Sequence, residues 1–270
     1  MAGLDDVVAP VTGTADVVVL FTPSAAYHER VVDGVEQPVV VVAPENTVDA
    51  ERYVELPLEF ADVTERVRFG IEGTIDTGFV EEGDVAICAT RLFGEETDTV
   101  LRVRAGAFSR SGVYRLFMDS RADPSVVRDV LEVAIELGRK GQKGKRVGAL
   151  FVVGDAGKVM NESRALSYNP FEKSHVHVGD PIVNVMLKEF SRLDGAFVIS
   201  DAGKIVSAYR YLEPSAEGVD IPKGLGARHM AAGSVTRDTN AVAVVLSESD
   251  GLVRAFMGGE LVLELDPEEY

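Results

Sequence analysis

The stretch DGAFVISDAGKIVSAYRYL (residues 194–212) contains two apolar runs, 194–200 and 203–212, separated by the turn residues Asp-Ala-Gly. Their composition predicts two strands joined as a hairpin. Other short apolar runs predict further strands in the same half of the chain, at 148–154, 241–248 and 252–257. Because helical segments alternate with these strands, the C-terminal half is expected to be an α/β domain.

Three helices are predicted in this half. One at 180–193 begins with Asp180 as cap and Pro181 at the first position. Another begins at Asp123-Pro124, ends at Gly138 and carries an apolar stripe at helical spacing. The third follows a glycine-rich loop within 224–239.

The N-terminal half is also predicted to be α/β. Short β-branched runs predict strands at 15–22, 38–44, 83–93 and 98–106, with a short helix at 23–32. The segment GRKGQKGKR (138–146) is basic and has no apolar residue, which makes it either a solvated loop or a basic rim beside a phosphate site. We expect two domains, 1–120 and 121–270.

The chain has a formal net charge of −17, and most of it lies in the first half: residues 1–139 carry −14 and residues 140–270 carry −3. This negative charge repels nucleic acid and anionic lipid. We therefore expect no nucleic acid and no membrane as partners. The acidity also suits a salt-rich cytoplasm, where screening suppresses self-repulsion, and we therefore hypothesise a halophilic host.

The sequence shows no membrane span, because no apolar run approaches 18 residues, and no basic region of a secretory signal precedes the first apolar run. Cys88, the only cysteine, lies in an apolar run and is expected to be a buried thiol. We therefore expect a cytoplasmic protein.

Three segments contain candidate metal-binding or phosphate-binding residues. Asp194-Gly195-Ala196 combines a metal-type carboxylate with a glycine that permits close approach, although an ordinary Asp-Gly turn would look the same. Gly226-Ala227-Arg228-His229 places backbone N–H groups and side-chain donors at a helix entry, which suits a triphosphate but is also compatible with a plain glycine-rich entry. Glu248 follows a strand as a second possible metal carboxylate or a simple turn residue.

Taken together in this order, these segments resemble the diadenylate cyclase domain, in its archaeal type, over residues 123–265. The resemblance implies a fold with a central mixed sheet flanked by helices. The strand opening at Gly148-Ala149-Leu150, the Tyr211-Leu212 pair and the closing GGELV (258–262) fit the same family. The Asp-Gly-Ala and Arg-His segments are specific as a pair, whereas either alone is weak.

The resemblance implies an Mg²⁺- or Mn²⁺-dependent nucleotidyltransferase that condenses two ATP molecules into the second messenger cyclic di-AMP and releases two pyrophosphates. It implies a homo-oligomer with face-to-face active sites, each holding one ATP. By carry-over, the catalytic residues are Asp194, Arg228 and His229. The implied ATP-binding residues are Gly195, Ala196, Leu212, Gly226, Ala227, Arg228 and His229, and the implied metal ligands are Asp194 and Glu248.

Two departures favour an alternative function. Many relatives have Thr at the position of Ala227 and a second Arg at that of Met230, so two possible phosphate contacts are missing. A non-catalytic nucleotide-binding regulatory protein therefore remains the alternative. His175 and His177 could bind a metal from one strand face, but no third ligand is apparent, and we expect an exposed strand or loop without a catalytic role.

The N-terminal half resembles the C-terminal domain of pyruvate kinase, chiefly over 73–105, with a similarity that covers 12–106. In that family the domain helps to assemble subunits and can bind effectors. The resemblance implies an assembly or regulatory module that brings no catalytic residues. An acidic module is a poor phosphate binder unless local arginines such as Arg91, Arg102 and Arg104 cluster.

Overall fold

The computed structural model describes residues 12–58, 60, 62–93, 97–107, 112–141, 145–190, 194–213, 219, 221–222 and 224–269. The chain divides into two compact units, Met1–Tyr114 and Arg115–Tyr270, each of which is described by itself. The division lies a few residues before the predicted domain boundary at 120/121. Within the described residues, no helix is both long and apolar enough to cross a bilayer.

The first unit is built on a five-stranded sheet in the order β3-β2-β1-β4-β5. Strands β1 to β4 run parallel, and β5 pairs antiparallel with β4. Every residue of β1 and β4 is buried, because the sheet interior is covered on both faces. The strands are β1 (Val17–Phe21), β2 (Val39–Ala43), β3 (Tyr53–Glu55), β4 (Val85–Thr90) and β5 (Thr99–Arg104).

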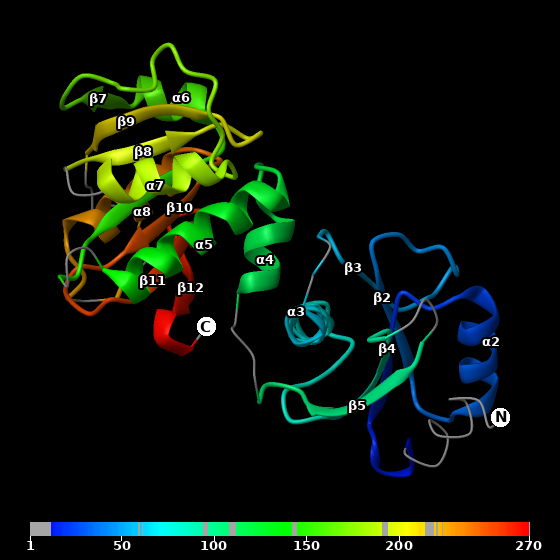
Figure 1. Ribbon diagram of the computed structural model, residues 1–270. Coiled ribbons are helices and arrows are strands. Elements are labelled where there is room, and N and C mark those ends of the chain that lie inside the picture. Colours follow the sequence, from blue (N-terminus) through cyan, green and yellow to red (C-terminus); the bar gives the residue numbers. More distant parts are fainter. Residues whose placement is uncertain are drawn as a thin grey trace. The chain divides into compact units, whose positions relative to one another are not determined.

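Helices α2 (Ala25–Gly34) and α3 (Val63–Asp76) cover opposite faces of this sheet (Figure 1). α2 starts where the Ser24 side chain accepts the Tyr27 N–H at 3.3 Å. Helix α3 was not predicted from the sequence. A β-carbon at its Gly70 or Gly73 would overlap the sheet side chains, so these poor helix formers are present because the helix packs so close.

Cys88 is fully buried on β4, and burial raises the pKa of its thiol to about 12. The expectation of a buried, inert thiol is therefore confirmed. The short helix η1 (Thr12–Thr14) lies in the first unit, and α4 (Val113–Met118) contains the division between the two units.

The second unit has a seven-stranded sheet in the order β12-β11-β10-β6-β8-β9-β7. Only β6 and β8 pair in parallel; every other neighbouring pair is antiparallel. The strands are β6 (Ala149–Val153), β7 (Ser163–Ala165), β8 (Ala196–Ile199), β9 (Ile205–Leu212), β10 (Val242–Leu246), β11 (Val253–Met257) and β12 (Glu260–Leu265). This mixed sheet confirms the predicted α/β class.

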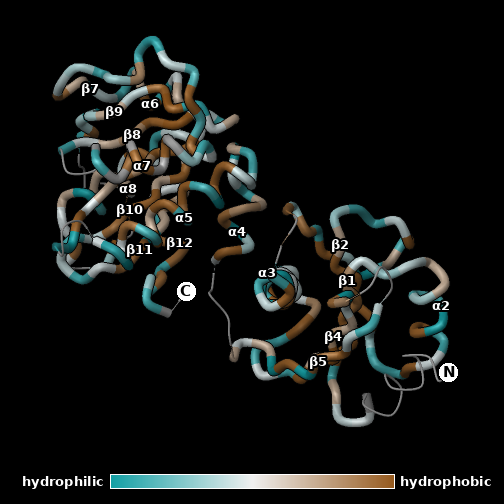
Figure 2. Tube along the Cα trace, in the orientation of Figure 1, coloured by the Kyte–Doolittle hydropathy of each residue, from teal (hydrophilic) through white to brown (hydrophobic). Residues whose placement is uncertain are grey.

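Helix α8 (Ala227–Asp238) packs on one face of the sheet, where Ala231, Ala232 and Val235 join a core with Val152 and Val245. Helices α5 (Pro124–Lys140) and α7 (Pro181–Phe190) pack against each other, and α5 also contacts β10. In Figure 2 the hydrophobic segments run along the strands and the helix sides that meet them. The remaining elements are α6 (Ala156–Asn161) and η2 (Pro267–Glu269).

One predicted helix end differs from the structure. α5 continues past Gly138 to Lys140, and Gly141 follows with a φ of 54° that favours glycine. Asp123 takes the cap position, but its side chain makes no capping hydrogen bond. α7 is described to Phe190, and the predicted continuation over residues 191–193 lies outside the described residues, as does the middle of the basic segment at 142–144.

Candidate functional site

A cavity of about 780 Å³ lies in the second unit, between β6, the β8–β9 hairpin, the start of α8 and the end of β10. Three segments that are distant in the sequence meet at its wall. All the predicted site residues line it: Asp194, Gly195, Ala196, Leu212, Gly226, Ala227, Arg228, His229 and Glu248. The sequence therefore identified residues that the fold brings together.

Gly195 positions Asp194 at the start of β8. Its φ is 108°, and a β-carbon there would come 2.8 Å from the Tyr209 backbone on β9. Tyr209 itself has a φ of 57°, at a register shift of the β8–β9 pair. Only glycine permits this close approach, which leaves the Asp194 side chain 93% exposed.

The start of α8 presents backbone donors to the cavity. Gly226 is the N-cap, and its carbonyl accepts the N–H groups of His229 and Met230. The N–H groups at the first two helical positions, Ala227 and Arg228, have no intrahelical acceptor. Together with the positive end of the helix dipole, they form a wall suited to an anion.

Arg228 lies between two carboxylates. Its guanidinium is 3.7 Å from Asp194 and 3.3 Å from Glu248, and its side chain is 34% exposed. Ion pairs that reach solvent in this way contribute little free energy, so a triphosphate can compete with either carboxylate for the guanidinium. The arrangement thus offers a cation that a polyanionic ligand can recruit.

His229 lines the cavity but is only 5% exposed. Burial, reinforced by the charge of Arg254, lowers the pKa of His229 to about 4. The imidazole is therefore neutral near pH 7 and provides a hydrogen-bonding group, whereas Arg228 provides the positive charge.

The described residues contain no cluster of three or more His, Cys, Asp or Glu side chains that could enclose a metal ion. Asp194 and Glu248 nevertheless lie at the same cavity, both well exposed. Mg²⁺ is typically held by one or two carboxylates together with substrate phosphates and water. The donor set fits a cation that arrives with a nucleotide.

Several cavity residues were not predicted. Leu166 follows the three-residue strand β7, which has no apolar pattern, and Arg210 lies inside the predicted strand 203–212. Arg210 donates to the Ser163 hydroxyl at 3.0 Å and to the Met160 carbonyl at 2.9 Å. Such contacts depend on strand pairing that the sequence does not reveal.

The other predicted features lie elsewhere. His175 and His177 are both exposed, and neither is among the residues described as lining the cavity. Arg146, from the basic segment, donates to the Ser249 carbonyl at 3.0 Å, so this segment reaches the turn beside the cavity. Arg102 and Arg104 line a smaller cavity of about 220 Å³ in the first unit, but Arg91 is not among its described lining residues.

Comparisons with known proteins cover both units. Residues 1–125 match a family model described as "Diadenylate cyclase, N-terminal", and residues 136–261 match one described as "DisA bacterial checkpoint controller nucleotide-binding". A diadenylate cyclase from Haloferax volcanii is 67% identical over 270 residues, 100% of both chains. One from Methanocaldococcus jannaschii is 45% identical over 157 residues, which is 57% of this chain and 50% of that protein.

Among solved structures, that of DacA from Staphylococcus aureus is 26% identical and has a TM-score of 0.36. The match covers 54% of this chain and 89% of that chain.

Proposed function

The chain belongs to the diadenylate cyclase family, and from this premise we propose that the cavity binds ATP and that two such sites together form cyclic di-AMP. The observation that carries the proposal is the convergence of Asp194, Arg228 and Glu248 on one cavity from three separate segments. Its volume lies within the range typical of small-molecule sites.

The reaction joins two nucleotides through two identical steps. In each step the 3′-hydroxyl oxygen of one ATP attacks the α-phosphorus of the other, and the bond from that phosphorus to the β-phosphate bridging oxygen breaks. Pyrophosphate leaves, and the hydroxyl proton passes to a base. Such a transfer depends on positioning and charge stabilisation and requires no covalent enzyme intermediate.

We assign the polar roles to the cavity's charged and hydrogen-bonding groups. The Arg228 guanidinium and the N–H groups of Ala227 and Arg228 hold the phosphates and stabilise the charge that develops on them. The exposed Asp194 carboxylate accepts the proton of the attacking hydroxyl.

The apolar part of the cavity is proposed to hold the adenine. Leu150, Leu212 and Ala231 line it, and Leu212 is buried at the end of β9, where its side chain can pack on a purine. Gly195 and Ala196 allow the nucleotide to approach the backbone closely.

Asp194 and Glu248 are the proposed ligands of Mg²⁺ or Mn²⁺. When bound, such a cation neutralises phosphate charge and orients the triphosphate. An assay of cyclic di-AMP formation with each metal in turn shows which one supports the reaction.

Because one cavity holds one ATP, the reaction needs a second copy of the chain with its cavity opposite the first. A homo-oligomer is therefore part of the proposal. The first unit, which has its own sheet and core, is proposed to serve assembly or regulation. A cytoplasmic location follows from the supply of ATP.

The test is to incubate the purified chain with ATP and either Mg²⁺ or Mn²⁺, at low and high KCl, and to detect cyclic di-AMP by mass. We expect product from the wild type and loss of product in Asp194→Asn and Arg228→Ala. Arg237→Ala is the matched control, because Arg237 lies at the other end of α8 and pairs with Asp238.

The alternative, a regulatory protein that binds nucleotide without turnover, is favoured by the absence of a hydroxyl at Ala227. It predicts ATP binding with no product under any of these conditions. Product from the wild type excludes it. An Asp194→Asn variant as active as the wild type would contradict the assigned site.

A further inference from the structure

Arg254, on β11, has all three arms of its guanidinium engaged although its side chain is only 6% exposed. Nε lies 2.6 Å from Glu264 on β12, and Nη2 lies 2.8 Å from Asp250. The third arm, Nη1, is 3.4 Å from Nε2 of His229. Arg254 thus joins two carboxylates to a histidine that lines the ATP cavity.

This contact decides which nitrogen of His229 carries the proton. A guanidinium has five N–H donors and no acceptor, so Nε2 must be the acceptor. In the neutral ring the proton is then on Nδ1. Nδ1 is buried and has no hydrogen-bond partner among the described residues, so a donor is left over beside the cavity.

A second connection runs from Arg254 to the turn after β10. Asp250, which Arg254 binds, belongs to the turn that also carries Glu248 and Ser249, and both of these line the cavity. The Ser247 and Ser249 hydroxyls lie 3.1 Å apart within the same turn. A single buried side chain therefore links the first turn of α8 to the turn that presents the Glu248 carboxylate.

We propose that Arg254 is a positioning residue of the nucleotide site. It fixes His229 as the neutral ring with the proton on Nδ1, and it anchors the turn that carries Glu248. The inference rests on the proposed function only in its effect on turnover; the protonation of His229 is a property of the free protein.

The charges around His229 set the expected effect of removing Arg254. The imidazole faces Arg254 and Arg228, which disfavour its protonation, and Asp250 and Glu264, which favour it. Without Arg254, the two carboxylates lose their counter-ion while the ring stays buried. Arg254→Met should therefore raise the pKa of His229 and free Nε2 to carry the proton.

The direct test is ¹⁵N NMR of the full chain labelled at histidine, which separates protonated from unprotonated ring nitrogens. In the wild type we expect His229, assigned by its loss in His229→Gln, to show a protonated Nδ1 and an unprotonated Nε2 from pH 6 to 8, because its folded pKa is about 4. A protonated Nε2 in the wild type would overturn the inference, whatever the variants do.

Arg254→Met should move the midpoint of the His229 titration up by a unit or more and lower kcat about tenfold to hundredfold, as misplaced reacting groups do. Its activity should also fall as the pH drops below 7, where the wild type does not lose activity to His229. Arg254→Lys, which keeps the charge and a donor, should restore part of kcat. A purely structural role would lower the unfolding midpoint without changing the titration of His229.

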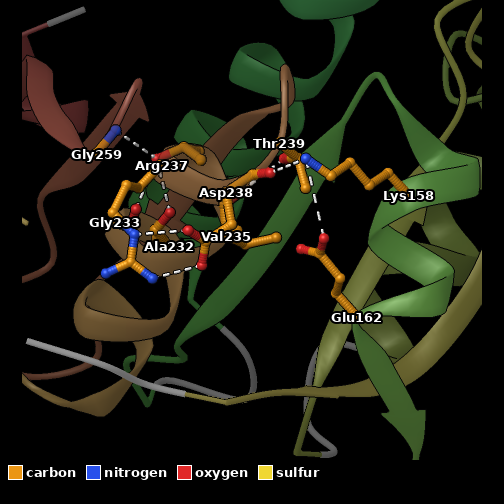
Figure 3. Close-up of polar contacts among 10 residues, drawn as sticks. Lys158, Glu162, Ala232, Gly233, Val235, Arg237, Asp238, Thr239 and Gly259 are labelled. Carbon is orange, nitrogen blue, oxygen red and sulfur yellow. Dashed lines mark hydrogen bonds and ion pairs between the residues drawn. The ribbon is translucent and has the colours of Figure 1, made fainter. Parts of the chain in front are cut away.

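Arg237→Met is the matched control. Arg237 pairs with Asp238 through Nε at 2.7 Å (Figure 3) and lies on α8 about two turns after His229. It should change neither the His229 spectrum nor kcat. If Arg254→Met does not fold, the Arg254→Lys variant and the wild-type spectrum still test whether Arg254 sets the protonation of His229. If the wild type makes no cyclic di-AMP, the proposed function fails, but the His229 spectrum still tests this inference by itself.

Discussion

Gly148, directly before β6, leaves the space that the guanidinium of Arg228 occupies. A β-carbon at residue 148 would overlap the guanidinium and would come 3.1 Å from the β-carbon of Glu248. Gly148 is not among the glycines with a positive φ, so its backbone conformation does not require glycine. The missing side chain instead makes room for the Arg228 guanidinium.

Gly148→Ala should displace Arg228 and weaken ATP binding about tenfold while the fold is retained. The physical reason is that the guanidinium can move away at little cost, but it then leaves the position between the two carboxylates. Calorimetric titration with ATP analogues measures the effect. Gly157→Ala is the control, because nothing lies within 4 Å of a β-carbon there, and it should bind as the wild type does. Equal affinity in both variants would contradict the role given to Arg228.

Ala227→Thr should tighten ATP binding, and Met230→Arg should change it little within one chain. Ala227 lines the cavity at the first position of α8, so a hydroxyl there can donate to a phosphate. Met230 is not among the described lining residues. A net hydrogen bond to a charged group is worth about 1.5–3 kcal/mol, so a change of roughly tenfold or more in Kd is expected for Ala227→Thr. Titrating both variants with the same ATP analogue shows which substitution changes the affinity more.

The free energy of unfolding of the first unit should depend on pH because of Glu72. This side chain is 6% exposed and accepts the N–H groups of Val113 and Tyr114 at the start of α4. Burial raises the pKa of Glu72 to about 7, above its ordinary value of 4.5. Between these values the folded state holds a proton that the unfolded state has released, so the free energy of unfolding falls as the pH rises from 4.5 to 7.

Glu72→Gln should remove this slope, because the amide oxygen still accepts both N–H groups without carrying a charge. One pKa unit corresponds to about 1.4 kcal/mol, so the difference between pH 5 and pH 8 is measurable. Hydrogen exchange of the β1 and β4 amides, corrected for the intrinsic rate at each pH, reports on this unit within the full chain. A wild type with the same protection free energy at both pH values would contradict the assignment.

Unfolding should also depend on salt. The formal net charge of −17 destabilises the folded chain by self-repulsion, and KCl screens that repulsion. We expect the thermal unfolding midpoint to rise between about 0.1 M and 2 M KCl. A midpoint independent of KCl would contradict the hypothesis of a salt-rich host.

Nine of the twelve described strands could be predicted, because each is a short apolar run bounded by turn residues, whereas β3, β7 and β12 were not predicted. β8 and β9 lie within the predicted hairpin, and β10 lies within the run at 241–248. Helix α3 could not be found in this way, because Gly70 and Gly73 weaken its helical pattern and their purpose appears only when β1 and β3 are packed beneath them. β7, three polar or small residues long, depends on pairing with β9.

The site residues that lie in compact sequence segments could be predicted. Those whose place depends on strand pairing could not. Asp194, Arg228 and Glu248 stand in segments whose order resembles a known family. Arg254 lies inside the predicted strand 252–257 with no local signal. Its burial requires Glu264 opposite it on β12, a register that no local pattern gives. Arg228 and His229 were both predicted as side-chain donors, and the structure adds that His229 is buried, with its pKa lowered to about 4, so that its ring is neutral.

The central claim is that Asp194 and Arg228 act on the same ATP. A crystal structure of the chain with Mg²⁺ and 3′-deoxy-ATP, which lacks the attacking hydroxyl, tests it most directly. We predict the triphosphate against the first turn of α8 with Arg228 in contact, the adenine beside Leu212, and Asp194 facing the α-phosphate of the same nucleotide. A nucleotide bound outside this cavity, or one held by only one of these two residues, would contradict the account.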